Sequence, residues 1–190
     1  MKTVILTLVM TLVLTLAGAG AFIYAGVFNV AANEPHWAMT HWVLGAVRER
    51  SIKVRAAGIA VPADLGGAKK LAAAAGHFVE HCATCHGGPG LKRGEFAAGM
   101  YPAPPVLKDV SSRYTPAEIF WILKNGIKMS GMPSMADDGD EMLWATVALL
   151  MKFPQMPADD FNDLWLEAQA GAAGGRGPMN MGGSGVHKHD

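Results

Sequence analysis

Two cysteines and a histidine stand close together in the segment Cys82-Ala83-Thr84-Cys85-His86, and the chain has no other cysteine. Residues at i, i+3 and i+4 share one face of a helical turn, so both thiols and the imidazole would point to the same side. Two thiols can form thioethers with the two vinyl groups of a porphyrin, and an imidazole can bind its iron. A CxxCH segment is typical of c-type haem attachment. We therefore predict one covalently attached haem c, held by Cys82, Cys85 and His86.

The cysteine count and the overall charge exclude several other kinds of protein. A disulfide framework would need more cysteines at wider separations, and a zinc site would need a second pair of ligands. The 190 residues carry 16 basic and 16 acidic side chains, so the formal net charge is zero. Nothing in this balance indicates a nucleic-acid partner.

The second axial ligand decides between an electron carrier and a haem that binds small molecules. Residues 125–135 supply Met129, Met132 and Met135 in an irregular stretch. We predict Met132 as the ligand, because the flexible Gly131 and the rigid Pro133 flank it. Met129 and Met135 are interpreted as gap-filling core residues. The alternative is an open sixth position, which would make the protein a haem-based enzyme or sensor for small ligands.

His86 would use one ring nitrogen for iron, and the other nitrogen should donate to a backbone carbonyl that fixes the ring. We expect this carbonyl within residues 101–107, the proline-rich segment that follows the cysteines.

Residues 3–33 contain no charged side chain, and an apolar stretch begins at Val4 and ends at Phe28. A helix needs ~20 apolar residues to cross a bilayer, whereas the apolar part of a signal peptide has ~7–15. Small residues at 17–21 leave cleavage open as an alternative, but we favour a retained anchor in the lipid bilayer. Lys2 precedes the span, and Glu34 follows it. The positive-inside rule then predicts a single-pass protein of the bacterial inner membrane, with the rest of the chain in the periplasm.

The elements that must position the haem ligands all have helical patterns. Residues 68–81 place Leu71, Ala75 and Phe78 on one stripe with Cys82. A second helix begins after Thr115 with a capping box and a proline, and stops at residues 125–126. A third runs from about residue 138 to Pro154. No segment alternates as a strand, so the predicted fold is all-α: a transmembrane helix followed by a small helical haem domain.

These patterns divide the chain into four parts. We assign residues 1–33 to a transmembrane anchor, 34–66 to a membrane-proximal helix and linker, 67–157 to the haem domain, and 158–190 to a flexible tail containing Gly, Met and His. Residues 40–59 can be helical and carry four basic side chains. They could lie against anionic headgroups or form a solvated linker helix, and both interpretations stay open.

Other potential ligands and charges have less specific patterns. Four residues of the tail could bind copper, although a plain flexible end is favoured: Met179, Met181, His187 and His189. Four histidines lack a partner at fixed spacing and are interpreted as surface or packing residues: His36, His41, His77 and His81. Four basic residues near the haem-binding segments could steer an acidic partner or be ordinary solvated side chains: Lys92, Arg93, Lys124 and Lys128.

Together, these motifs resemble the class I c-type cytochromes, in particular the single-haem, membrane-anchored bacterial proteins of that group. The resemblance rests on Phe78 before CATCHGGPG, on Pro105-Val106-Leu107, on residues 120–128, on Gly131-Met132-Pro133, and on Trp144. It implies His86 and Met132 as axial ligands. It also implies single-electron transfer between a membrane respiratory complex or periplasmic dehydrogenase and an oxidase or other acceptor, without enzymatic activity of the chain itself.

Two positions depart from the family pattern. Ala74 stands where a glycine is usual at the crossing of the first and last helices, and Leu149 replaces an aromatic residue. Both predict an adjusted helix contact away from the iron.

Overall fold

The computed structural model describes residues 1–65 and 67–174, and the chain divides into two compact units after Trp37. In the first unit, α1 (Lys2–Tyr24) is the only described helix that is long and apolar enough to cross a membrane. Its side chains are all exposed, as expected for a surface that lipid would cover. The hydroxyls of Thr7, Thr11 and Thr15 donate to carbonyls one turn back at 2.8–2.9 Å, which satisfies them without water.

The helix α1 ends earlier than the apolar stretch does. Gly26 adopts φ +62°, its N–H donates to the Ile23 carbonyl at 3.1 Å, and the Val27 N–H reaches the Phe22 carbonyl at 3.5 Å. This is the hydrogen-bond pattern of a glycine-terminated helix, so the backbone stops the helix although the side chains remain apolar.

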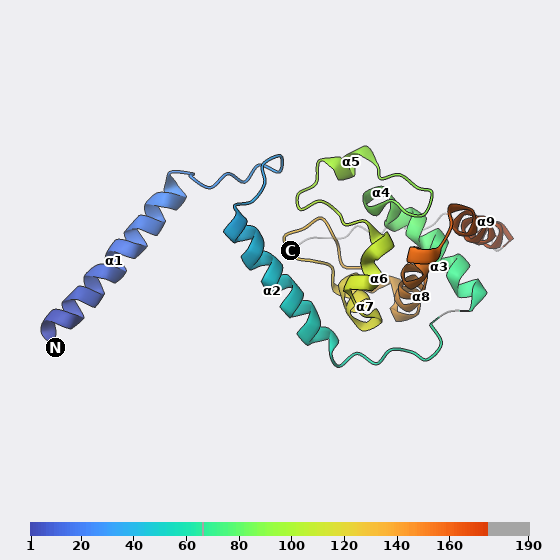
Figure 1. Cartoon of the computed structure of the whole chain (residues 1–190), viewed down its shortest axis with the longest axis horizontal. Coiled ribbons are helices and arrows are strands. Elements are labelled where there is room, and N and C mark those ends of the chain that lie inside the picture. Colours follow the sequence, from blue (N-terminus) through green and yellow to red (C-terminus); the bar gives the residue numbers. More distant parts are fainter. Residues whose placement is uncertain (66, 175–190) are drawn as a thin grey trace, which may run out of the picture. The chain divides into compact units, whose positions relative to one another are not determined.

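The second unit begins at Ala38 and is helical (Figure 1). Its α-helices are α2 (Ala38–Ala56), α3 (Ala68–His81), α4 (Ala83–His86), α5 (Glu95–Ala98), α6 (Val110–Arg113), α7 (Pro116–Asn125), α8 (Asp140–Lys152) and α9 (Ala158–Gly174). Short 3₁₀ turns lie at Leu107–Asp109, Ala136–Asp138 and Phe153–Gln155. The only β-type pairing among the described residues is a single bridge between Gly88 and Leu91, which confirms the all-α prediction.

Local sequence signals explain the limits of α7. Thr115 and Glu118 form the predicted capping box: the Glu118 N–H donates to Thr115 Oγ1 at 3.3 Å, and the Thr115 N–H donates to the Glu118 carboxylate at 2.8 Å. Pro116 occupies the first helical position, where its missing N–H costs nothing. Gly126, with φ +65°, follows the last residue and ends the helix.

The core forms where α3 packs against α8 and α9. Phe78, Phe153 and Phe161 are almost fully buried, and their rings meet edge to face with centroids 5.1–5.8 Å apart. Phe78 belongs to α3, which delivers the two cysteines. This cluster therefore fixes the helix that carries the attachment segment.

Two expectations about the flanking segments need correction. We expected a flexible tail from residue 158, but residues 158–174 form α9, and Phe161 on α9 completes the core. We expected residues 40–59 to form a helix that contacts only solvent or headgroups, but one face of α2 packs on α7 and buries Ile52 and Ala56, while the opposite face stays exposed. In both cases apolar residues find partners distant in sequence, which local periodicity does not show.

Candidate functional site

The attachment turn, residues 82–86, continues from the end of α3. The Cys82 N–H donates to the Phe78 carbonyl at 2.9 Å, and the carbonyl of Cys82 accepts the N–H groups of Cys85 at 3.1 Å and His86 at 2.9 Å. Both cysteines are free thiols, with Cys82 buried and Cys85 half-buried. One turn of helix thus presents two thiols and an imidazole, as the spacing predicted.

The buried position of Cys82 affects the protonation state of its thiol. Burial first, and then the charges of Asp138 and Cys85, raise the pKa of Cys82 to about 12. The group therefore stays an uncharged thiol at neutral pH, and its buried surroundings suit an uncharged sulfur. A thioether is also uncharged, so covalent attachment to a porphyrin fits this environment.

His86 is held through one ring nitrogen. Its Nδ1 lies 2.9 Å from the carbonyl oxygen of Pro105, which confirms the hydrogen bond predicted from the proline-rich segment. Burial lowers the pKa of His86, an effect that the nearby Arg93 reinforces and the Pro105 hydrogen bond opposes. The neutral ring donates from Nδ1 and keeps a lone pair on Nε2, which is the arrangement that a metal-binding histidine needs.

The methionine loop, residues 126–135, is tied to the end of α7 by its own backbone. The Ile127 N–H donates to the Met132 carbonyl at 3.1 Å, and the Met135 N–H donates to the Leu123 carbonyl at 3.1 Å. The Ser130 hydroxyl accepts the N–H of Met132 at 3.2 Å. Met132 is half-buried against the core, so its thioether is held within the domain.

The other two methionines of this loop differ from each other. Met135 packs against the core, as expected. Met129 does not: it is 79 % exposed and adopts φ +61°, a left-handed conformation unusual for a residue other than glycine. Its interpretation as a core residue was wrong, because the tight turn at this point directs the side chain into solvent.

Met100 connects the two haem-binding segments and was missed in the sequence. Its Sδ lies 4.0 Å from Cys85 Sγ, and a methyl group added at Gly131 would collide with its Cε. Gly131, next to Met132, therefore faces the attachment turn across a single flexible side chain. The signal was a methionine directly before the proline-rich segment, but no spacing rule distinguishes it from a packing residue.

This arrangement fits a haem. Two thiols and an oriented imidazole lie on one helical turn, and the unbranched side chain of Met100, which can move aside, lies between Cys85 and Gly131, the neighbour of Met132. Haem c, when bound, supplies an iron that gains and loses one electron. Cys82, Cys85, His86 and Met132 are the residues that would hold it.

The remaining histidines of the described part of the chain do not assemble a metal site. His77 Nε2 lies 3.3 Å from Asp138 Oδ2, and the ring centroids of His77 and His81 are 4.5 Å apart. Burial lowers the pKa of His77 despite the nearby carboxylate of Asp138. Across residues 1–65 and 67–174, no group of three or more His, Cys, Asp or Glu side chains is arranged to hold a metal ion. The four predicted copper ligands at 179–189 lie outside the described residues.

Of the four basic residues near the haem-binding segments, Lys124 is paired with an acidic side chain. Lys124 Nζ pairs with Asp140 Oδ1 at 2.6 Å and lies over the ring of Phe120, so its charge is largely compensated. Lys92, Arg93 and Lys128 are exposed. The structure thus favours ordinary solvated cations over a continuous patch.

Comparison with known protein families identifies the domain that carries this site. Residues 69–150 match the family model of cytochrome c oxidase, cbb3-type, subunit III, and the match includes the attachment turn and Met132. Comparisons with curated proteins and with solved structures gave no match. Residues 69–150 therefore form a c-type cytochrome domain, a family for which haem c binding is implied.

Proposed function

We propose that the chain is a membrane-anchored monohaem c-type cytochrome that carries single electrons on the periplasmic side of a bacterial inner membrane. The observation that carries this proposal is the fixed imidazole of His86, which the Pro105 carbonyl orients on the same turn as two free thiols. A ligand arranged in advance suits electron transfer, because the iron need not rearrange its surroundings when its charge changes.

The axial pair decides the type of chemistry. His86 and Met132 together leave no open position, and a thioether stabilises reduced iron and raises the reduction potential. The half-buried position of Met132 and the backbone hydrogen bonds of its loop support this role. An electron carrier needs no acid or base at the iron, so no catalytic residue is assigned.

The family description suggests the class of partner. The matching family is described as subunit III of a cbb3-type cytochrome c oxidase. We therefore propose that the chain delivers electrons to a respiratory oxidase or is itself a subunit of such a complex. The donor would be a membrane respiratory complex or a periplasmic dehydrogenase. The apolar helix α1 supports membrane anchoring, and Lys2 before it supports a periplasmic haem domain.

Carbon monoxide distinguishes this function from that of a haem sensor or enzyme. The full-length protein is purified in detergent and reduced, and its visible spectrum is recorded before and after carbon monoxide is added. An electron carrier with Met132 on the iron gives a low-spin spectrum that does not change. A prompt spectral shift would show an open or easily opened sixth position and would favour the small-ligand alternative.

Association with an oxidase requires a separate experiment. Native membranes are solubilised, the tagged full-length chain is captured, and accompanying proteins are identified by mass spectrometry. Co-purification with oxidase subunits supports the proposed partner, whereas a chain that emerges alone supports a cytochrome that diffuses freely in the membrane.

A further inference from the structure

The helix α2 uses one face to pack on the haem domain and leaves the opposite face uncovered. Nine residues make about two and a half helical turns, so Val43 lies opposite the buried Ile52, and Val47 lies opposite the buried Ala56. Met39, Val47 and Val54 are 77 %, 62 % and 55 % exposed. We call the exposed stripe of Met39, Val43, Val47, Arg50 and Val54 the outer face.

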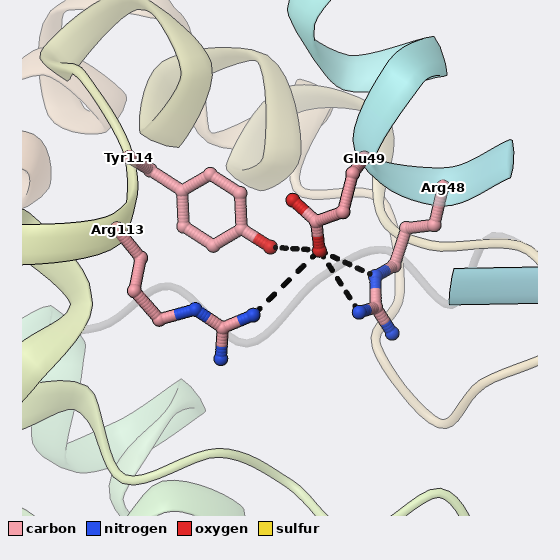
Figure 2. Close-up of polar contacts among 4 residues, drawn as sticks. All are labelled: Arg48, Glu49, Arg113 and Tyr114. Carbon is pink, nitrogen blue, oxygen red and sulfur yellow. Dashed lines mark hydrogen bonds and ion pairs between the residues drawn. The ribbon is translucent and has the colours of Figure 1, made fainter. Parts of the chain in front are cut away.

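A polar cluster fixes the rotation of α2, and with it the direction of the outer face. Figure 2 shows one carboxylate oxygen of Glu49 on α2 accepting the hydroxyl of Tyr114 at 2.8 Å and the guanidinium of Arg48 at 2.9 Å, with Arg113 at 3.7 Å. Tyr114 and Arg113 belong to the segment before α7. Together with the burial of Ile52 and Ala56, these contacts hold the outer face away from the haem domain.

The charges beside the outer face have one sign. Between residues 38 and 56 the sequence has four basic side chains and one acidic side chain, a net charge of 4 − 1 = +3. The acidic one is Glu49, whose carboxylate is already paired within the polar cluster. Arg50 and Lys53 are exposed, so the charged side chains on and beside the outer face are basic.

The position of α2 in the sequence indicates what covers this face. Thirteen residues, 25–37, separate the end of α1 from the start of α2, and even a fully extended chain of that length spans at most about 45 Å. The start of α2 therefore stays within that distance of the point where α1 leaves the bilayer. Exposed aliphatic residues, flanking cations and the 71 % exposed Trp42 are the features of helices that lie in the membrane interface.

We propose that the outer face of α2 lies on the surface of the bilayer, with its apolar side chains at the acyl boundary and Arg50 and Lys53 against anionic phospholipid headgroups. This inference rests on the membrane anchoring in the proposed function. The haem domain, which packs on the other face of α2, would then be held close to the membrane.

Photo-crosslinking in native membranes tests this contact. A benzoylphenylalanine probe replaces Val47 in the full-length haem-containing chain, and the matched control places the same probe at Phe96, an aromatic residue of α5 that is 73 % exposed. After irradiation, the adducts are identified by mass spectrometry. The proposal predicts phospholipid adducts at Val47 in several-fold excess over Phe96, and a several-fold loss of these adducts when Arg50→Glu and Lys53→Glu are added.

Four outcomes would overturn the proposal. Adducts of the Val47 probe with another protein would show that the outer face is a protein interface, and equal adducts at both sites would show no specific lipid contact. The haem spectrum of each variant verifies folding, and an alkaline wash of the membranes verifies anchoring separately. Release of the chain by that wash would refute the anchor, and with it this inference, whereas retention without lipid adducts refutes this inference alone.

Discussion

The attachment turn and the methionine loop hold their candidate ligands in different ways. At residues 82–86, the ligands follow directly from a helix whose Phe78 is locked in an aromatic cluster, and Pro105 orients the imidazole. At residues 126–135, Met132 depends on a loop that returns to the end of α7 through a few backbone hydrogen bonds and on Gly126. The first region is fixed by the core, whereas the second is fixed by turn geometry.

This difference predicts that the two sides of the haem fail differently. Damage to the core should unfold the whole domain, since the cysteines are an extension of α3. Damage to the loop should free the iron on one side while the haem stays covalently attached. The following variants separate these effects, starting with the largest.

Replacing Met132 with alanine should have the largest functional effect. Loss of the thioether opens the sixth position, so the reduced protein should bind carbon monoxide. Its midpoint potential should fall on the order of 0.1 V, within the ~0.8 V range over which axial ligands set haem potentials. Met129→Ala is the matched control, because that side chain is 79 % exposed in the same loop. Equal carbon monoxide binding and equal midpoint potentials in the two variants would show that Met132 does not bind the iron.

Phe161→Ala should give the largest loss of stability, through the core that supports the attachment turn. Truncation of a fully buried phenylalanine costs about 3–5 kcal/mol, so the unfolding free energy measured by denaturant titration should fall by that amount. The carbon monoxide response of the folded fraction should not change. Leu166→Ala, at a half-exposed position of the same helix, should cost much less. A loss of unfolding free energy in Phe161→Ala as small as that in Leu166→Ala would mean that α9 is not part of the core.

Gly126→Ala should act on the methionine loop. Gly126 adopts φ +65°, and an added Cβ would lie 2.6 Å from the carbonyl carbon of Pro133 and 2.7 Å from the carbonyl oxygen of Met132. We expect a loss of about 1–3 kcal/mol together with carbon monoxide binding, because the loop must shift. Gly139→Ala shares the positive φ but has open space around it, so only the conformational cost should appear. An unchanged ligand response in Gly126→Ala would show that Met132 does not depend on this turn.

Glu49→Gln tests a contact outside both regions and should have the smallest effect. Burial alone would raise the pKa of Glu49, but hydrogen bonds from Tyr114 and Arg48 and the charges of Arg48 and Arg113 hold it below its ordinary value of 4.5. A lowered folded-state pKa stabilises the protein above pH 4.5, and this contribution is lost as the pH falls further.

The variant should therefore lose less than about 1 kcal/mol of unfolding free energy at pH 7, because the group is partly exposed. The difference from the wild type should shrink as the pH falls below 4.5. Glu167→Gln on α9 is the control, since Glu167 is exposed. A difference that stays constant down to pH 3 would contradict the role assigned to the Glu49 carboxylate.

Features that depend on residues close together in the sequence could be predicted, whereas those that depend on residues far apart could not. Helix α3 and the capping box of α7 follow from local patterns and were predicted closely, and the segment 101–107 expected to supply a carbonyl to His86 does so through Pro105. The contribution of Phe161 could not be predicted, because its partners Phe78 and Phe153 are distant or separated by a proline, and the small residues after 167 obscured the helical pattern.

The misjudged features share a second cause. Both faces of α2 carry apolar residues, so its periodicity did not reveal the buried side. The roles of Met100 and Met129 could not be predicted, because a flexible methionine suits a ligand position, a core or a surface equally well. Only the placement of the turn at φ +61° and the approach of Met100 to Cys85 and Gly131 separate these roles.

The most direct test of the account is whether the purified full-length polypeptide keeps its haem after denaturation and acid extraction, measured by intact mass and by haem absorbance. The account predicts a mass increase of one haem in the wild-type chain and none in the Cys82→Ala, Cys85→Ala double variant. A colourless wild-type polypeptide without added mass would contradict covalent attachment and the proposed function built on it.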